Sequence, residues 1–238
     1  MVHPVVIPKP GALKGVIVVL DPGHGGADSG AIRQGVSEAK LTYRMAATLA
    51  AALHTAGAEV FFTVYSKTLA YAPKEGKPEP PLEAPTDACF AVDYKHVGLR
   101  HGESPEDLYR RAKLASGIWQ KHGKKRPVFF ISLHYDSLSV NKWRGGLACY
   151  DKRRGAPPKL AQVVARRLGE TGLAGQRRGE KPKPRELGVL NPLFNPVPES
   201  VLIELATISN KKDRAEAGSP SWRWKVAHLL TEAVRECR

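Results

Sequence analysis

The fold class is decided by the stretch Val16-Ile17-Val18-Val19-Leu20-Asp21-Pro22-Gly23-His24-Gly25-Gly26. Its first five residues are apolar and mostly β-branched, which is typical of a strand that is covered on both faces. The glycines that follow indicate a tight loop at the end of this strand. In open α/β sheets the carboxyl ends of the strands face the ligand crevice, so this loop lies where functional sites are built.

The residues after the loop alternate between helical and strand patterns. Ser37 offers an N-cap for a helix that ends at Gly57. Apolar side chains fall on one face of that helix, namely Leu41, Met45, Leu49, Ala52 and Leu53. Residues 59–64 then have the pattern of a second strand. This β-α-β order favours a parallel sheet.

The same alternation continues to the end of the chain. Helices are expected from Ser104 to about Lys121, at 159–168 and at 222–237, and strands at 128–134, at 145–150 and within 200–209. We therefore predict one α/β domain over residues 16–238, with a mostly parallel or mixed twisted sheet of about six strands and helices on both faces. Residues 1–15 form an irregular N-terminal segment, and residues 66–103 form a long proline-rich insertion.

Composition restricts the class of protein further. The 238 residues carry a net charge of +14, with 42% apolar and 25% charged residues, as in an ordinary soluble domain. Apolar runs fall far short of the ~20 residues of a membrane helix, and none near the N-terminus is typical of a signal peptide. Three isolated cysteines without a Cys-x-x-Cys pair argue against a disulfide scaffold or a thiolate zinc finger. The scarcity of Asn, Gln, Cys and Met suggests a thermostable protein.

The glycine-rich loop after the first strand allows two functions. A phosphate cradle would need glycine at Asp28 for the dinucleotide pattern, or a Gly-Lys-Ser/Thr sequence, and neither is present. The alternative is a metal ligand, His24, on a loop whose glycines let the backbone pass close to an ion. The second function fits the residues better.

Three further side chains could take part in chemistry. Glu38 begins the first helix, where an acid is also favourable for electrostatic reasons alone. His134 ends an apolar strand, where a histidine can equally be a hydrogen-bonded rim residue. Glu204 interrupts the apolar run 200–206, and a buried carboxylate without a partner is costly. Glu204 is therefore the residue that most needs a functional explanation.

Together these residues match the parts of a catalytic zinc site. Such sites use three protein ligands of the His/His/Glu kind and leave a fourth position for water. A nearby carboxylate can take the proton of that water as it attacks a carbonyl. Because the residues lie far apart in sequence, their spacing leaves separate structural roles equally open.

Read together, these segments resemble the zinc-dependent N-acetylmuramoyl-L-alanine amidases of bacterial cell walls and phage lysins, in order from Val16 to about Glu236. The Asp-Pro-Gly-His-Gly loop and the late strand with its glutamate carry the resemblance. It implies that His24, Glu38 and His134 are the Zn²⁺ ligands and that Glu204 is the catalytic base. It also implies a peptidoglycan substrate, cut at the amide between muramic acid and L-alanine.

The resemblance has further consequences for this chain. Arg111 matches a helix position that is structural in the family. Ala206-Thr207 stand where the family usually has Gly-Phe, which affects the cleft wall and no ligand. Only a short connection follows Tyr150, so we predict no inserted helix that blocks the zinc. We also expect a monomer without a separate wall-binding domain.

Other histidines and a basic stretch of the chain allow further interpretations. His96 and His101, near Asp93, form a weak candidate for a second metal site, and His54 and His228 are expected to be surface or packing residues. Residues 151–190 carry eleven Lys/Arg against four Asp/Glu, which suits anionic cell-envelope polymers. A basic nucleic-acid-binding protein is the rival, but no recognition motif accompanies the charges. A non-catalytic wall-binding module is a third alternative.

The expected place of action is the cell wall or periplasm. Without a recognisable export signal, we expect either a trimmed secreted enzyme or a phage-type lysin that is made in the host cytoplasm and released late.

Overall fold

A computed structural model gives the fold of the chain and describes residues 3–25, 28–65, 73–78, 89–90, 105–138, 143–175 and 181–238. Its centre is a six-stranded sheet in the order β4-β1-β7-β10-β8-β9. The strands are β1 (Ile17–Pro22), β4 (Glu59–Phe62), β7 (Val128–Asp136), β8 (Leu147–Asp151), β9 (Lys183–Arg185) and β10 (Glu199–Thr207). Neighbouring strands are parallel except β10 and β8, which are antiparallel. The predicted mixed α/β sheet is confirmed.

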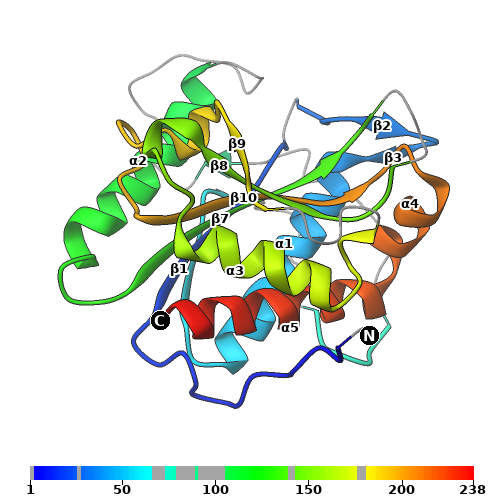
Figure 1. Ribbon diagram of the computed structural model, residues 1–238, viewed down its shortest axis with the longest axis horizontal. Coiled ribbons are helices and arrows are strands. Elements are labelled where there is room, and N and C mark those ends of the chain that lie inside the picture. Colours follow the sequence, from blue (N-terminus) through cyan, green and yellow to red (C-terminus); the bar gives the residue numbers. More distant parts are fainter. Residues whose placement is uncertain are drawn as a thin grey trace.

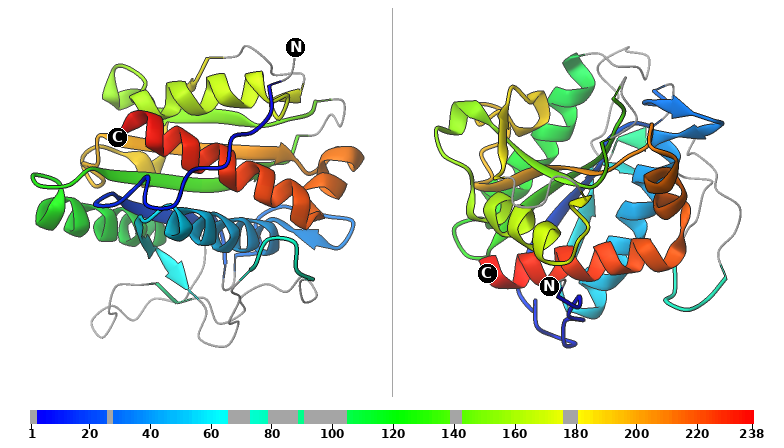
Figure 2. Two further views of the ribbon diagram at one scale, coloured as in Figure 1. Left: turned by 90° about the horizontal axis from the view of Figure 1, so that it is seen from below. Right: turned by 45° about the vertical axis from the view of Figure 1, so that its right-hand side comes forward.

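Helices cover both faces of the sheet, as predicted (Figure 1). One face carries α1 (Glu38–Thr55), α3 (Lys159–Glu170) and α5 (Pro220–Cys237), with α5 lying between the other two in Figure 2. The other face carries α2 (Pro105–His122) and the short 3-10 helix η3 (Gly188–Leu190). Among the described residues, no helix is long and apolar enough to cross a membrane.

Alternation along the central strands divides the core between the two faces. In β7, Phe129, Ile131 and Leu133 pack with the α1, α3 and α5 layer, whereas Val128 and Phe130 pack with α2. Successive side chains of a strand point to opposite faces, so the side chain of His134 points to the same face as those of Val128 and Phe130. The functional side chains at the end of β7 therefore lie on the α2 face of the sheet.

Several short elements were not predicted from the sequence. They are the edge strand β9, the hairpin strands β2 (Ile32–Arg33) and β3 (Val36–Ser37), the pair β5 (Val64–Tyr65) and β6 (Cys89–Phe90), and α4 (Lys211–Gly218). Strands of two or three residues are too short to show a period in sequence and depend on their partners. The predicted strand at 59–64 is split at Thr63, whose backbone N–H donates to the oxygen of Leu20 and whose hydroxyl donates to Asp21.

The connection after β8 is short in the structure. Only the 3-10 helix η1 (Lys152–Arg154) stands between β8 and α3. His54 bonds to the backbone oxygen of Ala58, and His228 bonds to Glu75, so both have packing partners, as expected. Cys149 and Cys237 are free thiols. The candidate second metal site at Asp93, His96 and His101 lies outside the described residues.

Candidate metal centre

The turn after β1 holds His24 in an unusual conformation. Its φ is 95°, a value that side-chain-bearing residues rarely adopt. Two glycines make room around it: a Cβ at Gly23 would lie 2.2 Å from the His134 ring, and one at Gly30 would lie 2.7 Å from the His24 ring. The glycines of this loop are therefore required because functional side chains occupy the space beside them.

Glu38 is placed by the start of α1. Ser37 caps the helix by accepting a hydrogen bond from the backbone N–H of Lys40, which fixes Glu38 as the first helical residue. The Glu38 carboxylate also accepts hydrogen bonds from the backbone N–H groups of Ala31 and Tyr135, at 3.2 and 2.9 Å. These bonds tie the helix start to both neighbouring segments and leave the side chain one orientation.

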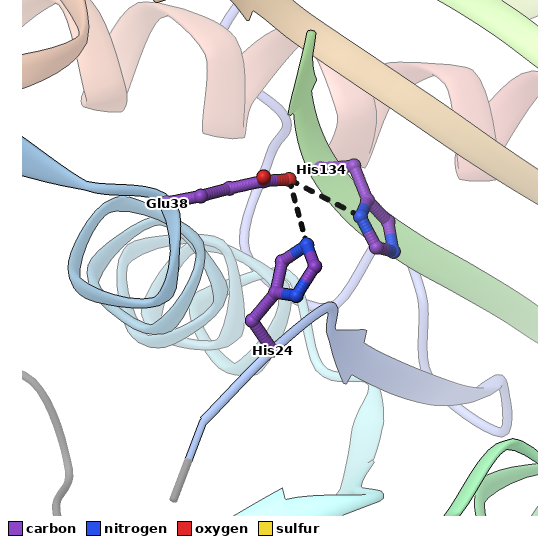
Figure 3. A group of neighbouring side chains, drawn as sticks. All are labelled: His24, Glu38 and His134. Atoms are coloured by element: carbon purple, nitrogen blue, oxygen red, sulfur yellow. Dashed lines mark hydrogen bonds and ion pairs between the residues drawn. The ribbon is translucent and has the colours of Figure 1, made fainter. Parts of the chain in front are cut away.

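Three predicted site residues come together at this point (Figure 3). Oε1 of Glu38 lies 3.1 Å from Nε2 of His24 and 3.2 Å from Nδ1 of His134. One ligand atom from each of the three residues lies within 4.8 Å of the other two. Two imidazoles and one carboxylate converging in this way form a donor set that suits Zn²⁺.

The charges of this cluster support one another. Burial lowers the pKa of His24, but hydrogen bonds to the Asp28 and Glu38 carboxylates outweigh it and raise that pKa to about 10. Burial likewise raises the pKa of Glu38, but its hydrogen bonds to His134 and His24 outweigh burial and hold that pKa far below its usual range. The cluster therefore favours a positive charge beside the Glu38 carboxylate.

Glu204 lies beside the cluster without belonging to it. It sits opposite His134 in the parallel register of β10 and β7, so both side chains lie on the same face of the sheet. The Glu204 side chain is only 12% exposed. Burial raises its pKa, an effect that the nearby charge of His134 opposes. A buried carboxylate near His134 and Glu38, with a raised pKa, has the properties of a proton acceptor.

Asp28 orients His24, a role that was not predicted from the sequence. Asp28 Oδ2 lies 2.6 Å from His24 Nδ1, and Asp28 Oδ1 accepts a hydrogen bond from the Gly30 N–H at 2.8 Å. The bond to Nδ1 leaves Nε2 directed at Glu38. The position of Asp28, four residues after His24 in a glycine loop, was the available signal.

The buried carboxylate of Asp21 also stabilises the turn that follows β1. The carboxylate of Asp21 accepts hydrogen bonds from Thr63 at 2.5 Å, Ser132 at 2.6 Å and Arg111 at 2.7 Å. Arg111 also donates to the backbone oxygen of Pro22 at 2.7 Å. Arg111 therefore has a structural role, as the resemblance implied, and that role is to hold the turn that carries the first histidine.

Comparison with known proteins gives the family. Residues 18–236 match the family described as N-acetylmuramoyl-L-alanine amidase. The chain belongs to this family. As a member, the enzyme cleaves the amide between N-acetylmuramic acid and L-alanine in peptidoglycan, and its place of action is the cell wall.

Relatives of this amidase cover most of its length. The germination-specific N-acetylmuramoyl-L-alanine amidase of Bacillus subtilis is 26% identical over 93% of this chain and 79% of its own. The amidase AmiA of Escherichia coli is 23% identical over 92% of this chain and 74% of its own. The CwlD amidase of Clostridioides difficile, solved with the GerS lipoprotein, superimposes with a TM-score of 0.66 at 20% identity, over 93% of this chain and 97% of that one. This last likeness supports the fold.

Proposed function

We propose that this amidase is zinc-dependent, with His24, Glu38 and His134 holding the metal. The observation that carries the proposal is the convergence of one donor atom from each residue within 4.8 Å. The donor set fits zinc, because His₂Glu is a known catalytic ligand set and the cluster already favours a positive charge. When bound, zinc supplies a Lewis acid that lowers the pKa of a coordinated water and polarises a carbonyl oxygen.

The protein residues prepare this chemistry in separate ways. Asp28 fixes which nitrogen of His24 faces the cluster, since it occupies Nδ1 at 2.6 Å. Glu38 is held by two backbone N–H groups and so keeps its carboxylate between the histidines. Preorganised ligands need no rearrangement during the reaction, which lowers its barrier.

Glu204 is proposed as the general base and then the general acid. Its carboxylate makes no hydrogen bond with any described residue, so its lone pairs remain available to a proton. Burial raises its pKa and brings it closer to the operating pH, where a base is most effective. Glu204 takes a proton from the water that attacks the amide carbonyl, and it returns the proton to the nitrogen of L-alanine as the C–N bond breaks.

The charge of the chain supports an additional expectation about its environment. A net charge of +14 suits attraction to anionic polymers of the cell envelope. We also propose that the enzyme is attracted to these anionic polymers and that it acts as a monomer. Release as a phage-type lysin and thermostability remain predictions from the sequence. Family membership favours the hydrolase over a nucleic-acid-binding protein.

Digestion of purified sacculi with and without a chelator tests the proposal. New L-alanine amino termini should appear with the metal-loaded enzyme and disappear in chelator, whereas new reducing sugar ends would overturn the proposed bond. Glu204→Gln should lower the rate by about 10²–10⁴-fold, as loss of a general base does, while zinc content and fold are kept. Loss of zinc in that variant would make Glu204 a ligand instead. Glu170→Gln, which removes an exposed carboxylate on α3, is the matched control.

A further inference from the structure

A cation lies beside the proposed base. Nη1 of Arg185 is 3.6 Å from Oε1 of Glu204, and the arginine side chain is 43% exposed where the glutamate is 12% exposed. At 3.6 Å the charges attract without forming a hydrogen bond. Within the described part of the chain, Arg185 makes no hydrogen bond to any group. Its N–H donors therefore remain available beside the base.

The edge of the sheet places Arg185 on the functional face. In the parallel pair of β8 and β9, Arg185 stands opposite Asp151, and Cys149, two residues earlier in β8, packs on the α2 side. Alternation puts Arg185 on that same side. Asp151 is already engaged by Arg153, which donates to it at 2.7 Å. The carboxylate that attracts Arg185 is therefore Glu204, which lies two strands away on the same face of the sheet.

The positive charge of Arg185 opposes the negative charges around Glu204. Glu38 and Asp136 add negative charge near Glu204, and each raises the pKa of that carboxyl. Each of these two carboxylates repels a carboxylate of the substrate. A guanidinium with uncommitted donors offsets the repulsion, and its planar fork binds a carboxylate through two hydrogen bonds.

We propose that Arg185 binds a carboxylate of the peptidoglycan stem peptide close to the scissile amide; this inference rests on the proposed function. The stem residue after L-alanine is a D-glutamyl residue joined through its side-chain carboxyl, so its α-carboxyl is free in some walls and amidated in others. Successive Cα atoms of a chain lie 3.8 Å apart. A carboxylate one residue from the cleaved bond therefore falls within reach of an arginine that stands 3.6 Å from the base. Arg185 selects the free-acid stem over the amidated stem.

Two matched muramoyl-peptides test this inference, one with the free α-carboxylate and one with the carboxamide. The wild-type, zinc-loaded enzyme should cleave the acid with a kcat/KM about 10–100-fold higher, the range expected for one charge-assisted hydrogen-bond pair. Arg185→Gln should abolish that preference, with the loss of kcat/KM on the acid appearing mainly in KM. Arg185→Lys should keep part of the preference, since the charge stays while the fork is lost.

The controls separate this inference from the proposed function. Arg235→Gln removes an arginine of similar exposure, paired with Glu232 on α5, and should leave the preference intact. Equal kcat/KM of the wild type on both substrates would overturn the role of Arg185 while leaving amide hydrolysis established. An equal loss on both substrates in Arg185→Gln would also overturn it, because a merely structural arginine acts in that way. Cleavage of neither substrate by the wild type would overturn the proposed function itself.

Discussion

Gly23→Ala should remove His134 from the metal centre. A Cβ at this position would lie 2.2–2.6 Å from three atoms of the His134 ring, whereas ordinary contact begins at 3.4 Å. The ring must therefore retreat by about 1 Å, and a zinc-bound nitrogen tolerates only about 0.2 Å around its 2.0–2.1 Å distance. Loss of a residue that only hydrogen-bonds to a metal ligand lowers metal affinity about 10–100-fold. Loss of a ligand itself should lower metal affinity further. We expect zinc affinity to fall by at least about 100-fold, with amide hydrolysis falling alongside.

Equilibrium dialysis against zinc, combined with thermal unfolding followed by circular dichroism, measures this effect. The His134 side chain is 22% exposed and lies two residues before the end of its strand, so it can move while the fold is kept. Gly117→Ala is the matched control, because a Cβ there meets nothing within 4 Å and the residue lies inside α2. That control should stabilise the fold by about 0.4–1 kcal/mol and leave zinc affinity unchanged. Wild-type zinc affinity in folded Gly23→Ala would refute the assignment of His134 as a ligand.

The remaining predictions concern the groups around the turn. Asp28→Asn should lower zinc affinity in dialysis by about 10–100-fold, because His24 loses its charged partner, and an unchanged affinity would contradict that role. Arg111→Met should destabilise the fold in urea by about 3–5 kcal/mol, since it leaves Asp21 buried without its cation; a change within 0.5 kcal/mol would argue against it. Burial raises the pKa of Asp21, but Arg111, Ser132 and Thr63 outweigh it and lower that pKa below 3.8. The stability that the ionised Asp21 contributes is therefore fully present above pH 3.8, and it is lost as the pH falls through the lower pKa of the folded state. The difference in unfolding free energy between wild type and Asp21→Asn should be constant from about pH 5 to 7 and should shrink below about pH 4. A difference that stays the same down to pH 2 would contradict this.

The long elements could be predicted because each carries its own periodic signal. The apolar run that became β1 and the Ser37 cap that begins α1 are local features, and both appear where expected. The run around Ile203 in β10 was recognisable because its one carboxylate broke an otherwise apolar strand. Elements of two or three residues, such as β9, contain too few side chains for a pattern and form only through pairing with a neighbour.

The sequence predicted the types of residue that form the site, but not the residues that hold them in place. Asp21 and Arg185 were absent from the predicted site, because each matters through contacts with residues distant in sequence. Asp28 lies only four residues from His24, but its contact depends on the conformation of the loop between them. Arg185 is the clearest case: it stands on an edge strand that was not predicted, and its partner lies two strands away in the sheet.

Sequence alone determined the order of strands and helices, the glycine loop after the first strand and the types of side chain available for chemistry. These follow from local preferences and from a repeating apolar pattern, which act between neighbours along the chain. Only the tertiary structure decided that His24, Glu38 and His134 meet within 4.8 Å, and that Glu204 shares a face with His134. Both facts depend on strand order and register, which are set by packing between distant segments: Glu38 and His134 are 96 residues apart, and His134 and Glu204 are 70 apart.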